Sequence, residues 1–545
     1  MMKAIFWLTF AAIAFSSAGS AEQRRPVVAP AQVPDATSIV TTTAGKVQGL
    51  KDRGISTFKG IRYGKAPVGP LRFMPPEKPH PWAGIADATG FGAPAMQLYS
   101  PSGERTSDFT RQIQTIFPTQ TEEKIDNEDC LFLNVWTPTA DGKKRPVLVW
   151  FHGGGYNYGS GAWPVYDGRN LAAKGDMVVV TVNHRLNAFG YLYLADRFGK
   201  DFAASGNVGN LDLVASLQWV RENIAAFGGD PANVTIAGES GGGSKVSTLL
   251  ATPAANGLFQ KAIIQSGPGV TGGKKEDAAR FTDAILAQAG IDSVDKLRGA
   301  PADAILAAAR TVMTRLASGG FGTGPGFGPI VDGTVLPRDP FVPTAPAQSR
   351  DVPVMIGWNK DEMTLFTASM PWFGTLDAAG LDKMAAAMGP QGPALIANYR
   401  KIEPGYDPTH LASRAMTSRF IAGTYTLADR KAEQGGAPVY VYRLAYETPV
   451  NGGALKTPHT LDLPFMFDNV EMSRVLVGPG PAPQRLADMM SDAWIAFAHT
   501  GVPASPLLPT WTAYTPGKRA VMQFDVKPRI VDDPEAGMRI IMAPR

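Results

Sequence analysis

Cysteine is nearly absent from this sequence: Cys130 is the only one among 545 residues. A single cysteine cannot form an internal disulfide, so the folded chain must be stabilised by its hydrophobic core. After the first residues, no apolar run approaches the roughly 18 residues that predict a membrane-spanning helix. An excess of one charge is also lacking, since the formal net charge is +4 and lysine and arginine are scattered. This distribution argues against nucleic-acid binding.

The N-terminus has the three parts of an export signal. Met1–Lys3 is short and positive, residues 4–15 are apolar, and residues 16–21 are mostly small. The apolar part is too short to span a bilayer. The pattern predicts a signal peptide over residues 1–21, cleaved after Ala18 or Ala21. No cysteine lies at the cleavage region, so we expect an exported protein, periplasmic or secreted, with no stable membrane anchor; a buried N-terminal helix is the alternative.

The rest of the chain reads as a globular α/β protein. Apolar residues make up 44% and charged residues 18%, enough for a large core. Short β-branched runs are typical of strands buried on both faces. They lie at residues 147–151, 177–182, 234–237, 262–265, 352–356 and 439–442. Helical patterns separate them, which predicts a mostly parallel sheet with helices on both faces.

One helical pattern is especially regular, and three other segments are not. An apolar stripe runs from Leu213 to Phe227 and ends at Gly228-Gly229, as helices often do. Residues 84–126 lack periodicity and predict surface loop. The glycine-rich residues 318–328 predict either a flexible linker or a loop folded at the mouth of the active site. We expect a flexible segment over residues 22–38 and a single domain over residues 39–545.

The sequence Gly-Glu-Ser-Gly-Gly at residues 238–242 follows the apolar run 234–237. A strand, then G-x-S-x-G, then the small residues that open a helix, is the pattern of a nucleophile elbow. Such a turn forces the serine into an unusual backbone conformation and crowds the neighbouring backbone, which glycine tolerates. Ser240 is therefore the candidate nucleophile; an ordinary glycine-rich turn is the alternative.

A second glycine motif supplies candidate oxyanion donors. His152 and three glycines, residues 153–155, directly follow the strand predicted over residues 147–151. Consecutive glycines let backbone N–H groups point at a ligand without Cβ clashes. This motif lies about 90 residues before the G-x-S-x-G, the arrangement that esterases and lipases use. A tight strand-ending turn is the alternative.

A serine hydrolase also needs a base downstream of Ser240. Only His410, His459 and His499 lie there. His499 closes an apolar helix over residues 490–498, where the helix dipole favours it, and His410 lies in an ordinary helix lead-in. His459 lies in a loop after the strand at residues 439–442 and is the candidate base.

The acid that orients the base has to follow a strand between the serine and the histidine. Asp361 and Glu362 come shortly after the strand predicted over residues 352–356. The pattern alone does not separate these two carboxylates.

Several further motifs carry a family resemblance. They are residues 58–63 (FKGIRY), 70–73 (PLRF), 128–136 (EDCLFLNVW) and 227–231 (FGGDP). Together with the two glycine motifs, the chain resembles the type-B carboxylesterase/lipase family, which includes bacterial carboxylesterases and cholinesterases, from about residue 41 to residue 519. The resemblance implies an α/β-hydrolase fold, with a large, mostly parallel central sheet, helices on both faces and inserted loops forming an active-site gorge.

The resemblance also implies roles for individual residues. It makes Glu362 the acid, and it places the oxyanion donors at the N–H groups of Gly154, Gly155 and Gly241. Glu239 and Ser266 become buried supporting residues near the histidine, acting through a water network. No metal and no organic cofactor is implied.

The chain departs from the family at two places. The family pairs the cysteine at position 130 with an upstream cysteine, where this sequence has Ala95. The loop from Met96 to Asp129 is therefore not cross-linked, and because cholinesterases use this loop to bind a cation, a choline substrate is disfavoured. His184 replaces the family's usual aromatic residue, and we expect it to be structural.

These inferences predict a serine carboxylic-ester hydrolase that acts on small esters through a Ser-His-Glu triad and an acyl-enzyme. A lipase, an amidase or a lactone hydrolase on the same triad is the nearest alternative. A non-catalytic binding protein is disfavoured because Ser240, Glu362 and His459 are all present. The sequence is compatible with a monomer and with a homodimer. Five aromatic residues are candidates either for the gorge or for the core: Tyr156, Trp358, Phe366, Trp372 and Phe373.

Overall fold

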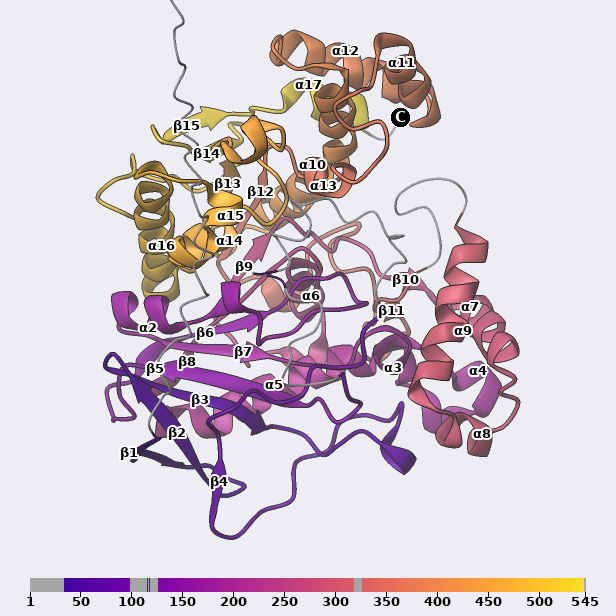
Figure 1. Cartoon of the computed structure of the whole chain (residues 1–545), viewed down its shortest axis with the longest axis vertical. Coiled ribbons are helices and arrows are strands. Elements are labelled where there is room, and N and C mark those ends of the chain that lie inside the picture. The colour runs from indigo at the N-terminus through magenta and orange to yellow at the C-terminus, as the bar shows by residue number, and fades with distance from the viewer. Residues whose placement is uncertain (1–33, 99–114, 116, 118–125, 318–325, 544–545) are drawn as a thin grey trace, which may run out of the picture.

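A large twisted sheet forms the centre of the molecule (Figure 1). The computed structural model describes residues 34–98, 115, 117, 126–317 and 326–543. Within these ranges the sheet has 13 strands in the order β1-β2-β3-β5-β7-β6-β8-β9-β12-β13-β14-β15, with β4 paired to β2. The strands are β1 (Pro34–Thr41), β2 (Lys46–Asp52), β3 (Ile55–Arg62), β4 (Ile85–Asp87), β5 (Phe132–Thr137), β6 (Arg145–Phe151), β7 (Val178–Val182), β8 (Gly229–Glu239), β9 (Lys261–Gln265), β12 (Val354–Asn359), β13 (Val439–Leu444), β14 (Ala520–Phe524) and β15 (Arg529–Asp532). A separate parallel pair consists of β10 (Gly273–Lys274) and β11 (Ile330–Val331).

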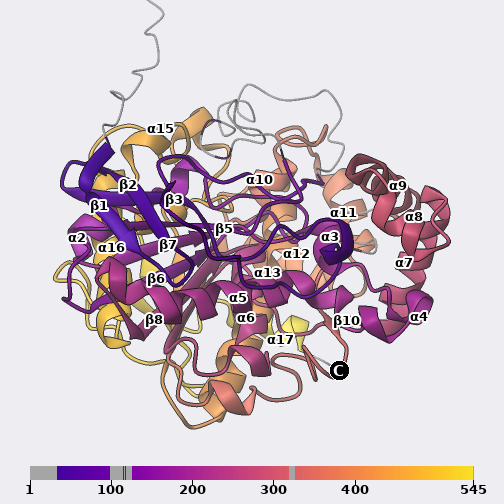
Figure 2. The same ribbon diagram turned by 90° about the horizontal axis from the view of Figure 1, so that it is seen from below.

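Helices cover the sheet, and further helices lie beside it on two sides of the molecule (Figure 1). They are α2 (Arg169–Gly175), α3 (Asn187–Tyr191), α4 (Ala195–Phe198), α5 (Val208–Asn223), α6 (Gly241–Leu249), α7 (Lys275–Ala289), α8 (Val294–Gly299), α9 (Ala302–Leu316), α10 (Met363–Thr367), α11 (Ala378–Ala387), α12 (Gly392–Ile402), α13 (Pro408–Glu433), α14 (Leu463–Met466), α15 (Arg474–Val477), α16 (Ala482–Thr500) and α17 (Ala536–Met542). Helices α7, α8 and α9 gather at one side of the molecule in both ribbon views (Figures 1 and 2).

The predicted sheet topology is confirmed at its centre. The seven strands β7, β6, β8, β9, β12, β13 and β14 are parallel to one another. The edges differ, because β1, β2, β3 and β5 pair in antiparallel fashion with their neighbours along this path, as does β15 with β14. All six predicted strands are present, with boundaries that differ by a few residues.

The central strands are buried on both faces, which explains their continuous apolar runs. In β6, Val147 and Val149 belong to the core that includes residues of α5, α6 and α13. The alternate residues Leu148 and Trp150 belong to a second core with residues of α2 and α16. Because successive strand residues point to opposite faces, a strand between two helix layers needs apolar residues at every position.

The helix predicted from Leu213 to Phe227 begins earlier and changes form at its end. Helix α5 begins at Val208 and is followed by a 3-10 turn over Ile224–Phe227. Gly228 ends this turn with φ of 84°, a left-handed conformation that suits glycine. The predicted glycine termination is therefore confirmed.

The prediction that residues 84–126 are entirely surface loop is wrong at its start. Strand β4 pairs in parallel with β2 over Ile85–Asp87. Three residues are too few to show a period in the sequence, and only the neighbouring strand provides their hydrogen bonds. Residues 99–114, 116 and 118–125 of the predicted loop lie outside the described residues.

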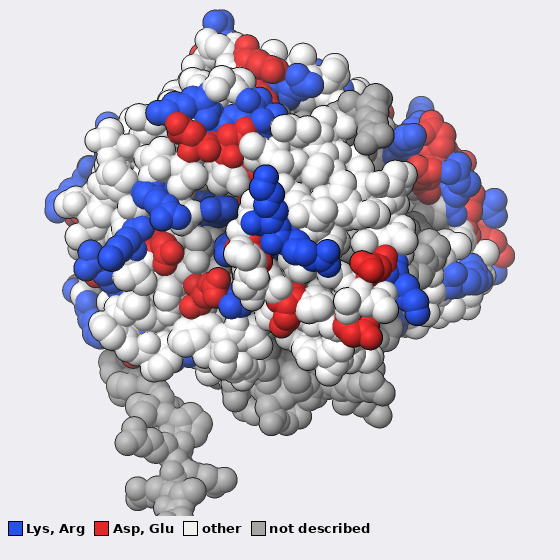
Figure 3. Space-filling model, turned by 90° about the horizontal axis from the view of Figure 1, so that it is seen from above, with Lys and Arg blue, Asp and Glu red and all other residues white. Residues whose placement is uncertain are grey.

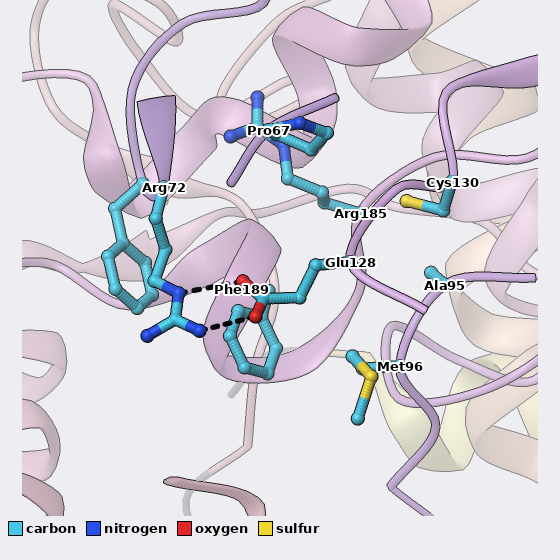
Figure 4. A pocket seen from close by; sticks show the side chains of 9 residues that line it. Pro67, Arg72, Ala95, Met96, Glu128, Cys130, Arg185 and Phe189 are labelled. Atoms are coloured by element: carbon cyan, nitrogen blue, oxygen red, sulfur yellow. Dashed lines mark hydrogen bonds and ion pairs between the residues drawn. The ribbon is translucent and has the colours of Figure 1, made fainter. Parts of the chain in front are cut away.

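An ion pair anchors the residues just before β5, at the end of the loop that the family's disulfide would cross-link. Cys130 is buried and free, and it lines a small pocket together with Ala95 (Figure 4). Across the same pocket, Arg72 Nε donates to Glu128 Oε2 at 2.7 Å. Arg72 also donates to the carbonyls of Leu297, Arg298 and Ala300. The start of β5 is therefore tied to the body of the protein without a covalent link.

The surface and the helices agree with the charge and hydropathy patterns. On the face seen from above, basic and acidic side chains are interspersed (Figure 3), so that face has no continuous basic patch. Among the helices of the described ranges, none combines the length and the apolar character needed to cross a bilayer.

Candidate active site

The carboxyl ends of the parallel strands bring the predicted site residues to one edge of the sheet. The glycine motif with His152 follows β6, Ser240 follows β8, Ser266 follows β9, and Glu362 follows β12. The loop with His459 follows β13. Residues far apart in the chain meet there because parallel neighbours end at the same side, where ligand sites of open α/β sheets lie.

Ser240 occupies a strained turn between β8 and α6. Its φ is 56° and its ψ is −122°, a conformation that non-glycine residues rarely adopt. Its N–H donates to the carbonyl of Gln265 at 2.8 Å. A Cβ at Gly242 would lie 2.0 Å from the carbonyl oxygen of Phe151. Only a residue without a side chain fits there, so the G-x-S-x-G turn is sterically required.

His459 and Glu362 form a close buried pair. His459 Nδ1 lies 2.5 Å from Glu362 Oε2, and both side chains are at most 3% exposed. The other carboxylate oxygen of Glu362 accepts the N–H of Asn359 at 2.7 Å. Because a carboxylate only accepts, Nδ1 carries the hydrogen, and the second ring nitrogen is left for proton transfer.

The structure separates the two carboxylates that the pattern left open. Asp361 is buried, but its oxygens accept the hydroxyl of Tyr406 at 3.0 and 3.1 Å. Burial raises the pKa of Asp361, despite the charges of Lys360 and Arg414. The side chain next to His459 is that of Glu362, as the family resemblance implies.

The other two histidines downstream of Ser240, His410 and His499, contact backbone carbonyls away from Glu362. His410 follows the N-cap Asp407 of α13, and its Nε2 contacts the carbonyl of Ala454 at 2.8 Å. His499 lies in the last turn of α16, with Nε2 at 2.8 Å from the carbonyl of Gly175. Both bind backbone carbonyls, in agreement with the structural roles expected for them.

Glu239 lies directly against the free nitrogen of the same imidazole. Its Oε1 is 3.1 Å from His459 Nε2, which is ion-pair distance but outside hydrogen-bond geometry. Burial raises the pKa of Glu239 to about 8, although the charge of His459 opposes this shift. For His459, burial lowers the pKa, but the charges of Glu239 and then Glu362 outweigh it and raise the value to about 9. The carboxylates therefore stabilise the imidazolium.

In addition to Glu362 and Glu239, a third carboxyl group that was not predicted from the sequence is buried near His459. Asp462 is fully buried, and its Oδ2 accepts from Tyr442 and from Gln265 Nε2, both at 2.8 Å. Asn359 Nδ2 donates to the carbonyl of Pro458 at 3.0 Å and so holds the loop of His459. The only sequence signal is an aspartate three residues after His459, which has no meaning without the tertiary contacts.

The glycine motif runs alongside the nucleophile turn. Gly154 and Gly155 have φ of 80° and 62°. A Cβ at Gly241 would lie 2.2 Å from the carbonyl oxygen of Gly155, and one at Gly153 would lie 3.5 Å from Ser240 Cβ. The three predicted oxyanion donors therefore belong to backbone segments in close contact.

Ser266 lies in a second tight turn against the elbow. It is buried with φ of 50°, and its N–H donates to Gly357 at 2.8 Å. Within the described residues its hydroxyl has no hydrogen bond. A Cβ at Gly267 would lie 1.8 Å from the carbonyl oxygen of Ser240, so this turn supports the elbow by close backbone packing.

The aromatic candidates divide between site and core. Phe366 lies beside His459, with ring centroids 5.0 Å apart. Trp358 is fully buried against Tyr425 and belongs to the core. Trp372 is half-buried and packs against that core, and the half-buried Phe373 contacts His410. Phe420, which the sequence reasoning did not single out, also contacts His459 at 5.6 Å.

Tyr156 lies beside the nucleophile helix, because its hydroxyl bonds Ser244 Oγ of α6 at 2.7 Å. A Cβ at Gly328 would lie 3.3 Å from the ring of Tyr156. The end of the glycine-rich segment therefore packs near the site, whereas residues 318–325 lie outside the described residues.

The pKa values predict an alkaline activity profile that depends on Glu239. The predicted base His459 can accept a proton only when neutral, so kcat/KM should rise as it loses its proton. Removing the charge with Glu239→Gln should lower the pKa of His459 and move the acid limb of the kcat/KM profile by about one pH unit to lower pH. Glu447→Gln, which changes a surface carboxylate paired with Lys456, is the control and should leave the limb in place. An unshifted limb in Glu239→Gln would contradict the assignment.

Comparisons with known proteins agree with this geometry. A model of the carboxylesterase family matches residues 36–383 and 405–539. The para-nitrobenzyl esterase of Bacillus subtilis (strain 168) is 37% identical over 511 residues, which cover 92% of this chain and 97% of the relative. The phenmedipham hydrolase of Pseudarthrobacter oxydans is 33% identical, over 89% of this chain and 94% of the relative.

A solved structure shows the same fold. The crystal structure of a carboxylesterase of Geobacillus stearothermophilus superposes with a TM-score of 0.80 at 40% identity, covering 93% of this chain and 100% of that chain. The α/β-hydrolase architecture expected from the sequence is thereby confirmed. The chain belongs to the carboxylesterase family, and it is a carboxylic ester hydrolase.

Proposed function

We propose that the chain hydrolyses small carboxylic esters through a triad of Ser240, His459 and Glu362. The observation that carries the proposal is the buried contact of 2.5 Å between His459 Nδ1 and Glu362 Oε2. It lies at the same sheet edge as the strained turn of Ser240. A nucleophile, a base and an orienting acid are the parts that acyl transfer by a serine enzyme requires.

In the proposed reaction, Ser240 Oγ attacks the ester carbonyl while His459 Nε2 takes its proton. The N–H groups of Gly154, Gly155 and Gly241 stabilise the tetrahedral oxyanion. Collapse breaks the ester C–O bond, and His459 delivers the proton to the leaving alcohol. Water, deprotonated by His459, then attacks the acyl-enzyme and releases the acid and Ser240.

The carboxylates around His459 support this reaction electrostatically. Glu362 keeps the hydrogen on Nδ1 and orients the ring, while Glu239 faces Nε2 and favours the imidazolium that forms in each half-reaction. Ser266 supports the elbow from the neighbouring strand end. Neither Glu239 nor Ser266 makes or breaks a bond in the proposed reaction.

The surroundings of His459 favour an ester with an aromatic alcohol part. Phe366 and Phe420 both contact the imidazole, and this ring delivers the proton to the leaving alcohol. Aromatic side chains beside that path provide apolar surface and ring contacts for an aryl or benzyl group. One relative carries a name that refers to such a group, the para-nitrobenzyl esterase.

We also propose that the enzyme is exported after cleavage of residues 1–21. The support is the charged, apolar and small-residue order of this segment, which precedes the described residues.

A fluorophosphonate probe tests both proposals, because it reacts with an activated serine. We expect the wild-type protein to be labelled and Ser240→Ala to stay unlabelled. In cells, the labelled band should appear in the periplasmic or extracellular fraction. Labelling of Ser240→Ala would overturn the assignment of the nucleophile, and a purely cytoplasmic band would overturn export.

A further inference from the structure

A buried lysine lies directly behind the proposed oxyanion hole. Lys245 belongs to α6, the helix that begins after Ser240, and it is 1% exposed. Its Nζ donates to the carbonyl of His152 at 2.8 Å. The charge of Glu239 acts on this ammonium from a distance, and no ion pair to Lys245 is present among the described residues. Burying an ammonium group without a close counter-ion is unfavourable, so the position calls for an explanation.

Other charged and titratable groups face Lys245 from four segments. Glu239 at the end of β8 supplies a negative charge, which partly offsets the effect of burial on the ammonium. His152 after β6 and His184 after β7 are stacked with centroids 5.0 Å apart. The ring of Tyr156 lies 5.5 Å from Nζ. Burial, reinforced by the charge of Lys245, lowers the pKa of both histidines well below the usual value, so both rings are neutral.

The neutral His152 ring forms the next hydrogen bond along the loop, with the glycine motif. Its Nδ1 lies 2.9 Å from the carbonyl of Gly153, and since a carbonyl only accepts, Nδ1 carries the hydrogen. The Gly153 carbonyl belongs to the peptide group whose N–H is that of Gly154. The next carbonyl, that of Gly154, accepts from the N–H groups of Asn157 and Tyr158. The carbonyl ends of both peptides that carry loop donors are therefore bonded.

Lys245 adds a side-chain donor from another element to this series. It binds the carbonyl of His152, one peptide before the first donor peptide, from the helix that carries the proposed nucleophile. Burial lowers the pKa of Lys245 to about 7, and the nitrogen can donate this bond in either protonation state. The same helix packs on the end of β6, where a Cβ at Gly242 would lie 3.0 Å from the carbonyl oxygen of His152.

We propose that Lys245 is a positioning residue of the reaction, which clamps the Gly153–Gly155 loop to helix α6 and keeps the oxyanion donors in register with Ser240. This inference rests on the proposed function. In this role Lys245 fixes the position of the oxyanion donors relative to the nucleophile. The Lys245 side chain itself touches neither the substrate nor the reacting atoms.

The test compares substrate turnover with the binding of a tetrahedral analogue. In Lys245→Met, which keeps the length but removes the charge and the donor, kcat should fall by up to about 10²-fold. The affinity for phenylboronic acid, which forms an anionic tetrahedral adduct with an active serine, should fall by the same factor. KM for p-nitrophenyl butyrate should stay within about twofold, because the ground-state ester does not need the oxyanion donors.

Lys431 provides the matched control. It is a fully buried lysine of α13 whose Nζ donates to the carbonyl of Arg350 at 2.8 Å, far along the chain from the site. Lys431→Met loses this bond and a second one to Gln434 Oε1 at 3.2 Å, so its Tm should fall by at least as much, whereas kcat and boronate affinity should stay at wild-type values. A purely structural role of Lys245 would make the two variants alike.

Wild-type kcat and boronate affinity in Lys245→Met would overturn the proposal. If that variant does not fold, Lys245→Gln serves instead; its shorter side chain places the donor away from the carbonyl of His152, and both quantities should fall by at least about threefold at unchanged KM. Wild-type values in Lys245→Gln would then overturn the proposal. Failure of the proposed function is distinguishable, since in that case the wild-type enzyme would not react with the fluorophosphonate probe.

Discussion

Replacing Ser240 by alanine is expected to lower kcat for p-nitrophenyl butyrate by about 10⁴–10⁶-fold, the range found when a serine nucleophile is removed. The reason is that the acyl-enzyme needs this hydroxyl, while the remaining oxyanion donors retain a small part of the catalysis. The fold should persist, because the substitution deletes one oxygen from a half-buried side chain and leaves the turn glycines in place. Stopped-assay kinetics and thermal unfolding of the same preparation measure both effects.

Ser247→Ala is the control for a serine lost from the same helix. Ser247 lies in α6, but its hydroxyl donates to the carbonyl of Gly243 at 3.0 Å and accepts the N–H of Gly269 at 3.1 Å. The activity of Ser247→Ala should stay within about tenfold of wild type, since each of these hydrogen bonds contributes about 1 kcal/mol to stability and neither involves His459. Comparable activity in the two variants would refute the assignment of Ser240.

Replacing Glu362 by glutamine should lower kcat by about 10⁴-fold, the loss seen when the orienting carboxylate of a triad becomes an amide. The carboxylate accepts the hydrogen of His459 Nδ1, and an amide can instead present its NH₂ group and favour the wrong tautomer. The imidazolium that forms during the reaction also loses its buried counter-charge. The measurement is kcat at a pH above the titration of His459, so that its protonation state does not confuse the comparison.

The neighbouring Asp361→Asn variant provides the sharpest comparison. The two residues are adjacent in sequence and both are buried, but Asp361 faces Tyr406 and not His459. Asp361→Asn should keep kcat within about tenfold while lowering Tm, because it weakens a buried hydrogen-bonded pair. A larger loss of kcat in Asp361→Asn than in Glu362→Gln would reverse the assignment of the acid.

Much of the fold could be predicted because local patterns report the environment of each strand. The run at residues 147–151 is apolar at every position, and a strand between two helix layers requires such a run. Strand β4 and the antiparallel edges could not be predicted this way. Three residues have no detectable period, and the direction of an edge strand depends on its partner and not on its own composition.

The features of the candidate site also fall into those that the sequence predicts and those that only the tertiary structure shows. By itself, the sequence determined the elbow of Ser240 and the glycine motif, because their backbone geometry excludes side chains and therefore leaves glycines at fixed spacings. The spacing left Asp361 and Glu362 open, the family resemblance implied Glu362, and the tertiary structure places Glu362 against His459. Only the tertiary structure revealed Asp462 and Lys245 as buried groups around the site. The physical reason is that the orientation of a side chain and the cost of burying its charge are set by neighbours that lie far away along the chain, and no spacing within a single segment records them.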